Sequence, residues 1–174
     1  MKKVTLQVTL TQKELIETAD RYHFDREALP QIEALYRAVL PLLRISAVYR
    51  LLSFADACAC AGDTGMVFGH SPFAAVCACA VTLGEGIDRL QELYSGAGAV
   101  WEDYILECLG NTLLEKTYER LGVMIWQETG LYLNGYRFPG SDMPIEKEKD
   151  ILQKLKKVTE APGPKETTEV SEKV

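Results

Sequence analysis

Apolar and polar residues alternate at the start of the chain. From Lys3 to Leu10 the apolar side chains fall on one side and the polar ones on the other (Val4, Leu6, Val8 and Leu10). A period of two is typical of a half-buried strand. The pattern therefore predicts a strand over this segment.

A short helix is predicted to follow the strand. Thr11 and Glu14 have the spacing of a capping box, in which two side chains satisfy free backbone N–H groups at a helix start. Apolar residues then recur at helical steps up to about Tyr22. We expect the helix to end there.

A second, longer helix is predicted from about Arg26 into the forties. Asp25 stands where a helix cap is needed, and Pro41 is expected to kink or end the helix because its ring removes a backbone N–H. Between Leu42 and Phe54 the chain is strongly apolar with β-branched residues. This composition fits both a helix and a strand, so both remain open.

Small residues alternate twice in the middle of the chain, as ACACA at 57–61 and VCACAV at 76–81. Such segments fit buried strands or places where two elements approach closely. Between them, Gly62-Asp63-Thr64-Gly65 indicates a turn, and 66–68 is a candidate strand. A short helix should follow the second repeat, with its inward residues at Ile87, Leu90 and Leu93.

The longest regular pattern runs from Val100 to Glu128, where apolar residues recur every three or four positions. It predicts one long amphipathic helix, closed by Gly130, since glycine tolerates a left-handed conformation. Leu131 to Phe138 is expected to be extended, with a hairpin turn or a bulge at Asn134-Gly135. A last helix is expected to start at Asp142 and Pro144, with apolar residues at Ile145, Ile151, Leu152 and Leu155.

Composition limits the kinds of protein this can be. The chain has 174 residues, 47% of them hydrophobic, which suits one domain with a real core over residues 1–157. Residues 158–174 lack aromatic residues and a sustained apolar pattern, so we expect a disordered tail. A net charge of -6 argues against nucleic-acid binding and against an anionic membrane surface.

The sequence also suggests a cellular location. It has no apolar run near the roughly 20 residues of a spanning helix, and its N-terminus turns polar too soon for a signal peptide. We therefore expect a cytoplasmic protein whose five cysteines are reduced thiols.

Two C-x-C motifs are candidates for a metal site. Cys58, Cys60, Cys77 and Cys79 could supply four thiolates to zinc or to an iron–sulfur cluster. Each motif is embedded in alanine, however, and cysteine is among the most buried residue types. Small-residue packing is the favoured interpretation.

Other candidate chemistry is weaker. His70 lies in a loop-like Phe-Gly-His-Ser-Pro context, where a surface or capping histidine is the more common case. The serines show no nucleophile-elbow pattern. Gly84-Glu85-Gly86 has neither a Walker lysine nor a dinucleotide fingerprint.

Glu115 and Arg137 are the most specific candidates for binding a small ligand. Arg137 follows the predicted extended segment and precedes a Pro-Gly turn, so its planar guanidinium and the turn's N–H groups could hold a carboxylate. The alternative is a structural clamp on the carbonyls of its own turn. Glu115 could equally be a solvated acid on the helix surface.

The order of these motifs resembles a known family. Thr82-Leu83-Gly84, a helix with Leu-Glu-Lys at 114–116, and the run RFPGSDMPIE from Arg137 to Glu146 resemble the activation domain of vitamin B12 (cobalamin)-dependent methionine synthase. The short stand-alone members of that family are more similar still. The resemblance covers about Val76 to Leu155 clearly, and the N-terminal part loosely.

The resemblance implies a fold and a function. The fold would be α+β, an antiparallel sheet packed with helices around one long central helix. The protein would bind S-adenosylmethionine and support the reductive methylation of a cobalamin-dependent methyltransferase acting in trans. Glu115 would hold cationic or hydroxyl groups and Arg137 the carboxylate; the remaining implied ligand-binding residues are Phe138, Pro139, Gly140 and Ser141. Implied partners are a corrinoid protein, which carries the cobalamin, and a second copy in a homodimer.

This chain departs from the family pattern at the turn. It is one residue shorter between Arg137 and Pro139, and Ser141 stands where the family has a tyrosine. Tyr132 and Tyr136 are nearby rings that could take its place. The departures favour a second hypothesis, an interaction or adaptor protein that keeps the fold and has lost the ligand. A metal-binding protein based on the cysteines is a third, weaker one.

Overall fold

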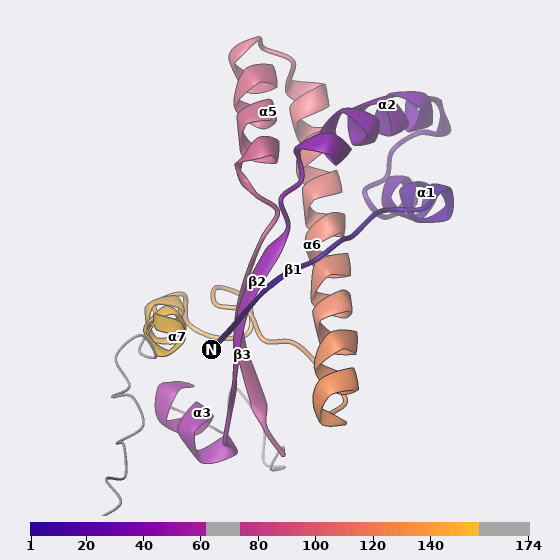
Figure 1. The fold of residues 1–174 in the computed structure, drawn as a ribbon. Coiled ribbons are helices and arrows are strands. Elements are labelled where there is room, and N and C mark those ends of the chain that lie inside the picture. Colours follow the sequence, from indigo (N-terminus) through magenta and orange to yellow (C-terminus); the bar gives the residue numbers. More distant parts are fainter. Residues whose placement is uncertain (62–73, 157–174) are drawn as a thin grey trace, which may run out of the picture.

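The computed structural model describes residues 1–61 and 74–156 of the chain, without the side chains of 59–61. These residues form an α+β fold in which helices surround a three-stranded antiparallel sheet. One helix is far longer than the others and runs beside the sheet and past its end (Figure 1). The fold class implied by the resemblance is thus confirmed at this coarser level.

The sheet is a meander with the strand order β1-β2-β3. Its strands are β1 (Lys2–Thr5), β2 (Ser46–Leu52) and β3 (Val76–Thr82). Tyr49 in the central strand lies opposite Lys2 on one side and Cys79 on the other. The open question about 42–54 is therefore settled in favour of a strand, and of the two interpretations of 76–81 the strand is the one observed.

The first strand is shorter than the alternation predicted. Pairing with β2 covers only Lys2–Thr5, although Leu6 still donates its N–H to the carbonyl of Ile45 at 3.1 Å. Leu6 and Leu10 are buried in the core. The alternating apolar pattern continues beyond Thr5 because these side chains are buried in the core, although the chain no longer pairs as a strand.

Two helices and two 3₁₀ turns connect β1 to β2, with bounds α1 Gln12–Arg21, η1 Arg26–Ala28, α2 Leu29–Val39 and η2 Leu40–Leu42. The Thr11–Glu14 capping box is present. Pro41 ends the second helix as predicted, within η2. Asp25 is at the predicted cap position, before Arg26, but its side chain makes no capping hydrogen bond.

The long helix α6 (Val100–Thr129) organises the core. It follows α5 (Glu85–Gly96) and ends at Gly130, whose φ of 73° is left-handed. Its buried side chains include Ile105, Leu109 and Leu113, and α1, α2, α5 and β3 all pack against it. The predicted helix and its glycine stop are confirmed. In α5, Ile87 is buried as expected, whereas Leu93 is exposed.

Two more helices, α3 (Phe54–Ala61) and α7 (Lys147–Lys156), lie together on the sheet face opposite α6 (Figure 1). Of the two interpretations of 57–61, the strand is thus excluded, because the first ACACA run is part of a helix. The last helix begins at Lys147, later than predicted. Residues 139–143 instead form a turn, in which Pro139 bridges to Met143 and the Asp142 carboxylate accepts a hydrogen bond from the Phe138 N–H. The turn at 62–65, the candidate strand at 66–68 and the tail at 158–174 lie outside the described residues.

Candidate functional site

Three aromatic rings attach segment 131–138 to the middle of α6. The ring of Tyr118 lies 5.7 Å from that of Tyr136 and 5.4 Å from that of Phe138, the latter edge to face. Tyr136 and Phe138 stack at 6.0 Å with planes 22° apart. Such aromatic pairs stabilise beyond their buried area. One turn further along α6, the absence of a side chain at Gly122 lets Leu133 approach closely.

The same packing places Arg137 on the outer side of the segment. Side chains of an extended chain alternate, so two neighbours that both face α6 leave the residue between them facing away. Arg137 is exposed, and its guanidinium donates to the carbonyl of Tyr136 at 2.8 Å. This bond goes to the carbonyl of the preceding residue, so whether Arg137 clamps its own turn or holds a carboxylate stays open.

The Pro-Gly turn after Arg137 is closed by its own hydrogen bonds. Gly140, with a left-handed φ of 86°, donates its N–H to Met143 O at 2.8 Å. The N–H groups of Ser141 and Asp142 both donate to Phe138 O, at 3.1 and 3.0 Å, and the Asp142 carboxylate accepts from the Phe138 N–H. The turn is therefore ordered, and its backbone donors are largely engaged inside it.

Tyr136 carries an unsatisfied polar atom beside this turn. Its hydroxyl oxygen is buried and has no hydrogen-bond partner among the described residues. Burial, followed by the nearby charges of Glu119 and Cys79, raises the pKa of this phenol above its usual range. Burial and Cys79 also raise the pKa of Tyr118. A buried hydroxyl without a partner is costly, and is a feature that a bound ligand can satisfy.

Glu115 lies on the side of α6 that faces α1. Its carboxylate accepts a hydrogen bond from the guanidinium of Arg21 and forms an ion pair with it. Both side chains are more than half exposed, so the pair is well solvated. The contacts described for Glu115 and for Arg137 thus run to different elements, α1 and segment 131–138. Pro139, Gly140 and Ser141 accompany Arg137 in its turn.

The cysteines are divided between the two faces of the sheet. Cys79 lies opposite Tyr49, whose hydroxyl donates to Glu128 of α6 at 2.9 Å, so Cys77 and Cys79 face α6. Cys58 is in α3, in the layer on the other face. Within residues 1–61 and 74–156, no three potential metal ligands gather. The side chain of Cys60 and the whole of His70 lie outside the described residues.

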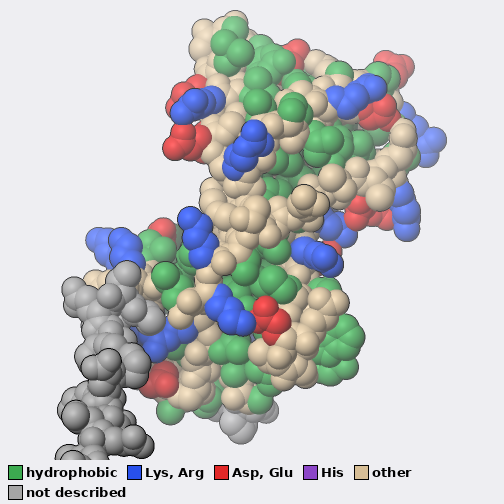
Figure 2. All heavy atoms as spheres, viewed as in Figure 1, with side chains coloured by type: hydrophobic (Ala, Val, Ile, Leu, Met, Phe, Trp, Pro, Cys, Tyr) green, Lys and Arg blue, Asp and Glu red, His purple; other side chains and the backbone are tan. Residues whose placement is uncertain are grey.

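Exposed apolar side chains surround the aromatic attachment. Figure 2 shows apolar side chains gathered at the lower right of the molecule. The exposed apolar residues of the C-terminal half of α6 and of segment 131–138 are Val123, Trp126, Tyr132, Leu133 and Phe138. Trp126 and Tyr132 contact each other, with ring centroids 5.5 Å apart. Tyr118, which holds the turn in place, was not among the residues predicted from the sequence. Tyr118 and Gly122 are four residues apart in the sequence, so they lie on the same face of α6. A ring and a glycine at that spacing could have indicated the face on which segment 131–138 packs.

No protein-family model and no curated protein matches this chain. Among the described helices, none combines the length and the apolar character needed to cross a bilayer.

Proposed function

We propose that this protein binds S-adenosylmethionine at the Arg137 turn and supports the reductive methylation of a corrinoid methyltransferase in the cytoplasm. One observation carries the proposal. The exposed guanidinium of Arg137 lies next in sequence to Tyr136, whose buried hydroxyl has no partner among the described residues. A charged fork and an unsatisfied hydroxyl are thus held by one ordered segment.

The chemistry of these residues suits the ligand. S-adenosylmethionine carries a carboxylate, an ammonium group and a sulfonium. Arg137 offers a planar fork for the carboxylate. The partly exposed ring of Phe138 offers a π-face for a cation. Glu115 remains the predicted acid for the ammonium group, and it would have to exchange Arg21 for the ligand.

In this function the protein breaks no bond of its own. S-adenosylmethionine would supply the methyl group to the partner's cobalamin, itself reduced by a separate electron donor, and would leave as S-adenosylhomocysteine once its S–CH3 bond had broken. The contribution of this chain is to bind the ligand and to hold it in a fixed orientation toward the partner. The ordered turn suits that task, because its conformation is maintained by its own hydrogen bonds before any ligand arrives.

A second function is favoured by other contacts. Arg21 already neutralises Glu115, and the N–H groups of Gly140, Ser141 and Asp142 donate within the turn. These polar groups therefore already have partners within the protein. Five large apolar side chains of α6 and segment 131–138 are exposed instead. An interaction or adaptor protein that has lost the ligand would show the same features.

Calorimetric titration with S-adenosylmethionine separates the two functions. We expect binding to the wild-type protein, and a loss of roughly 10- to 100-fold in Arg137→Ala, the range for a charge-assisted contact. Arg120→Ala is the matched control, since it removes an exposed arginine of α6 outside this turn. No heat at millimolar ligand would overturn the first function and leave the second.

The role of Glu115 needs its own pair of variants. Glu115→Gln removes both a ligand contact and the ion pair with α1, whereas Arg21→Gln removes the ion pair alone. If Glu115 binds the ligand, only Glu115→Gln weakens the affinity, and Arg21→Gln retains or increases it by freeing the carboxylate. Equal effects of the two variants would show that Glu115 serves only the contact with α1.

A further inference from the structure

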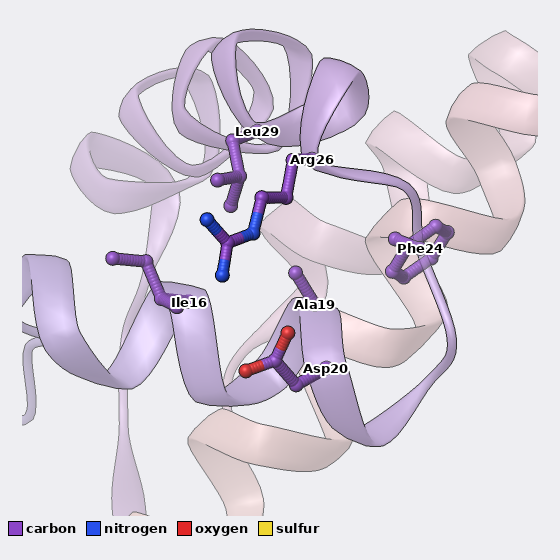
Figure 3. A pocket seen from close by; sticks show the side chains of 6 residues that line it. All are labelled: Ile16, Ala19, Asp20, Phe24, Arg26 and Leu29. Carbon is purple, nitrogen blue, oxygen red and sulfur yellow. The ribbon is translucent and has the colours of Figure 1, made fainter.

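A second candidate site lies at the other end of the molecule, between α1 and the start of α2. A pocket of about 170 Å³ opens there, lined by Ile16, Ala19, Asp20, Phe24, Arg26 and Leu29. Figure 3 shows all six side chains around it, with Asp20 on α1 and Arg26 above it on η1. None of these six residues belongs to the Arg137 turn or to the cluster of Tyr118, Tyr136 and Phe138.

The pocket is built by the way α1 ends. His23 adopts a left-handed conformation with φ of 59°, and its N–H donates to Asp20 O at 3.2 Å. The next N–H, from Phe24, reaches back to Ala19 O at 2.9 Å, which completes a Schellman motif. Phe24 is then fixed by an edge-to-face contact with Trp101 at 5.3 Å. The apolar floor, formed by Ala19 and Phe24, is therefore rigid.

Two opposite charges face each other across this floor. The guanidinium of Arg26 extends down into the pocket, toward the carboxylate of Asp20 (Figure 3). Both side chains are exposed, and in the described part of the chain they form no ion pair with each other and neither has a hydrogen-bond partner. An acid and an arginine that share a pocket without pairing leave room for a group that bridges them.

We propose that this pocket binds the head group of a small α-amino acid with an apolar side chain. The amino-acid carboxylate would pair with Arg26 and its ammonium group with Asp20. A simple anion would pair with Arg26 but be repelled by Asp20. A simple amine would pair with Asp20 but be repelled by Arg26. A zwitterion with both charges on one carbon satisfies both residues at once.

Size and lining select the rest of the ligand. The volume equals that of about six water molecules, which suits a small amino acid of up to roughly nine non-hydrogen atoms. The remaining lining residues are aliphatic or aromatic, so an apolar side chain is favoured over a polar one. Ile16 is 41% exposed at the rim, where a somewhat longer side chain can extend outward.

The first test is a titration of the isotope-labelled full chain, followed by NMR, with L-leucine and L-methionine. We expect amide shifts confined to residues 16–29, with a dissociation constant of about 0.1–1 mM, since so small a ligand makes few contacts. Isoamylamine lacks the carboxylate and N-acetyl-L-leucine lacks the ammonium group. Both should bind at least about tenfold more weakly. Equal binding of leucine and isoamylamine, or no shift at about 20 mM leucine, would overturn the proposal.

The second test assigns each charge with variants. Asp20→Asn should weaken leucine binding and abolish the preference for leucine over N-acetyl-L-leucine, because the partner of the ammonium group is gone. Arg26→Gln should abolish the preference over isoamylamine. Glu17→Gln on α1 and Arg37→Gln on α2 are matched controls that change charges near the pocket but not in it. If Asp20→Asn and Arg26→Gln bind leucine like the wild type, the site is not there.

A further variant separates this pocket from the Arg137 turn. S-adenosylmethionine itself ends in an α-amino acid, so both sites could respond to it. Arg137→Ala should leave leucine binding unchanged, and Arg26→Gln should leave the contribution of Arg137 to S-adenosylmethionine binding unchanged. Loss of leucine binding in Arg137→Ala would show that leucine occupies the turn instead, and would overturn the pocket proposal alone.

Discussion

The ammonium group of Lys116 on α6 lies 2.8 Å from the carboxylate of Glu14 in the first turn of α1. The other oxygen of that carboxylate accepts hydrogen bonds from the N–H and the hydroxyl of Thr11, at 2.8 and 2.9 Å. One acid therefore both caps α1 and attaches it to α6. The hydrogen bond from Lys116, followed by those from Thr11, lowers the pKa of Glu14 from 4.5 to about 2.

This pKa shift predicts a pH-dependent stability. Because the carboxylate has a lower pKa in the folded protein than in the unfolded chain, its stabilising contribution is present above pH 4.5 and is lost as the pH falls to about 2. We expect Glu14→Gln to unfold about 0.5–1 kcal/mol more easily at pH 7. Urea unfolding at several pH values should show this difference shrinking in acid.

A nearby acid on the same helix provides the control. Glu17 pairs with Lys13 at 3.5 Å on a largely exposed surface. Glu17→Gln should therefore change stability by less than about 0.5 kcal/mol at any pH. If it costs as much as Glu14→Gln, the effect is due to overall charge rather than to the cap.

The centre of α6 should be the most sensitive part of the core. Leu113 is 0% exposed, and replacing it with alanine leaves a cavity that helices and sheet border together. We expect Leu113→Ala to lower the free energy of unfolding by about 2–5 kcal/mol. Leu93→Ala makes the same chemical change at a side chain that is 66% exposed, and should cost less than about 0.5 kcal/mol in the same urea experiment.

The start of α5 depends on a glycine. A Cβ atom at Gly86 would lie 2.6 Å from the carbonyl oxygen of Leu42, which belongs to the backbone and cannot rotate away. Gly86→Ala should therefore lower the melting temperature, at a cost of about 1–3 kcal/mol. Gly96→Ala at the other end of the helix meets nothing within 4 Å and should be neutral or slightly stabilising. Equal effects would show that the close approach does not matter.

The hydroxyl of Tyr136 should oppose stability and favour ligand binding. Removing a buried donor that has no partner among the described residues should make Tyr136→Phe about 1 kcal/mol more stable than the wild type. If S-adenosylmethionine uses that hydroxyl, the same variant should bind it more weakly. Tyr132→Phe, at a ring that is 78% exposed, should change neither thermal unfolding nor calorimetric affinity.

Periodicity predicted the elements that have a clear polar side. Thr11 with Glu14 marked the start of α1, and the pattern from Val100 to Gly130 marked α6 and its end. The two small-residue runs show the limit of this approach. ACACA at 57–61 is helical and VCACAV at 76–81 is a strand. Both runs alternate alanine and cysteine, so neither has a polar side from which a period could be read. The second run differs only in the valine at each end, a residue that favours strands, and in its pairing with β2.

The candidate sites were predictable only in part. Arg137 and its turn could be found from the sequence, because a Pro-Gly turn is a local feature. The outward direction of Arg137 depends on Tyr118, 19 residues earlier in the chain, and could not be predicted from the local sequence. The pocket of Asp20 and Arg26 leaves no motif at all, since it depends on a left-handed His23, a conformation uncommon for residues other than glycine.

The length of α6 has a consequence for how this protein opens. Its first half is covered by α1, α2 and α5 and its second half by β3 and the aromatic rings, so neither end of the molecule has a core of its own. Amide protons near Leu109 and Leu113 should then exchange with solvent only through global unfolding. The amino-acid pocket and the Arg137 turn would lose their structure together, as parts of a single cooperative unit, and not one before the other.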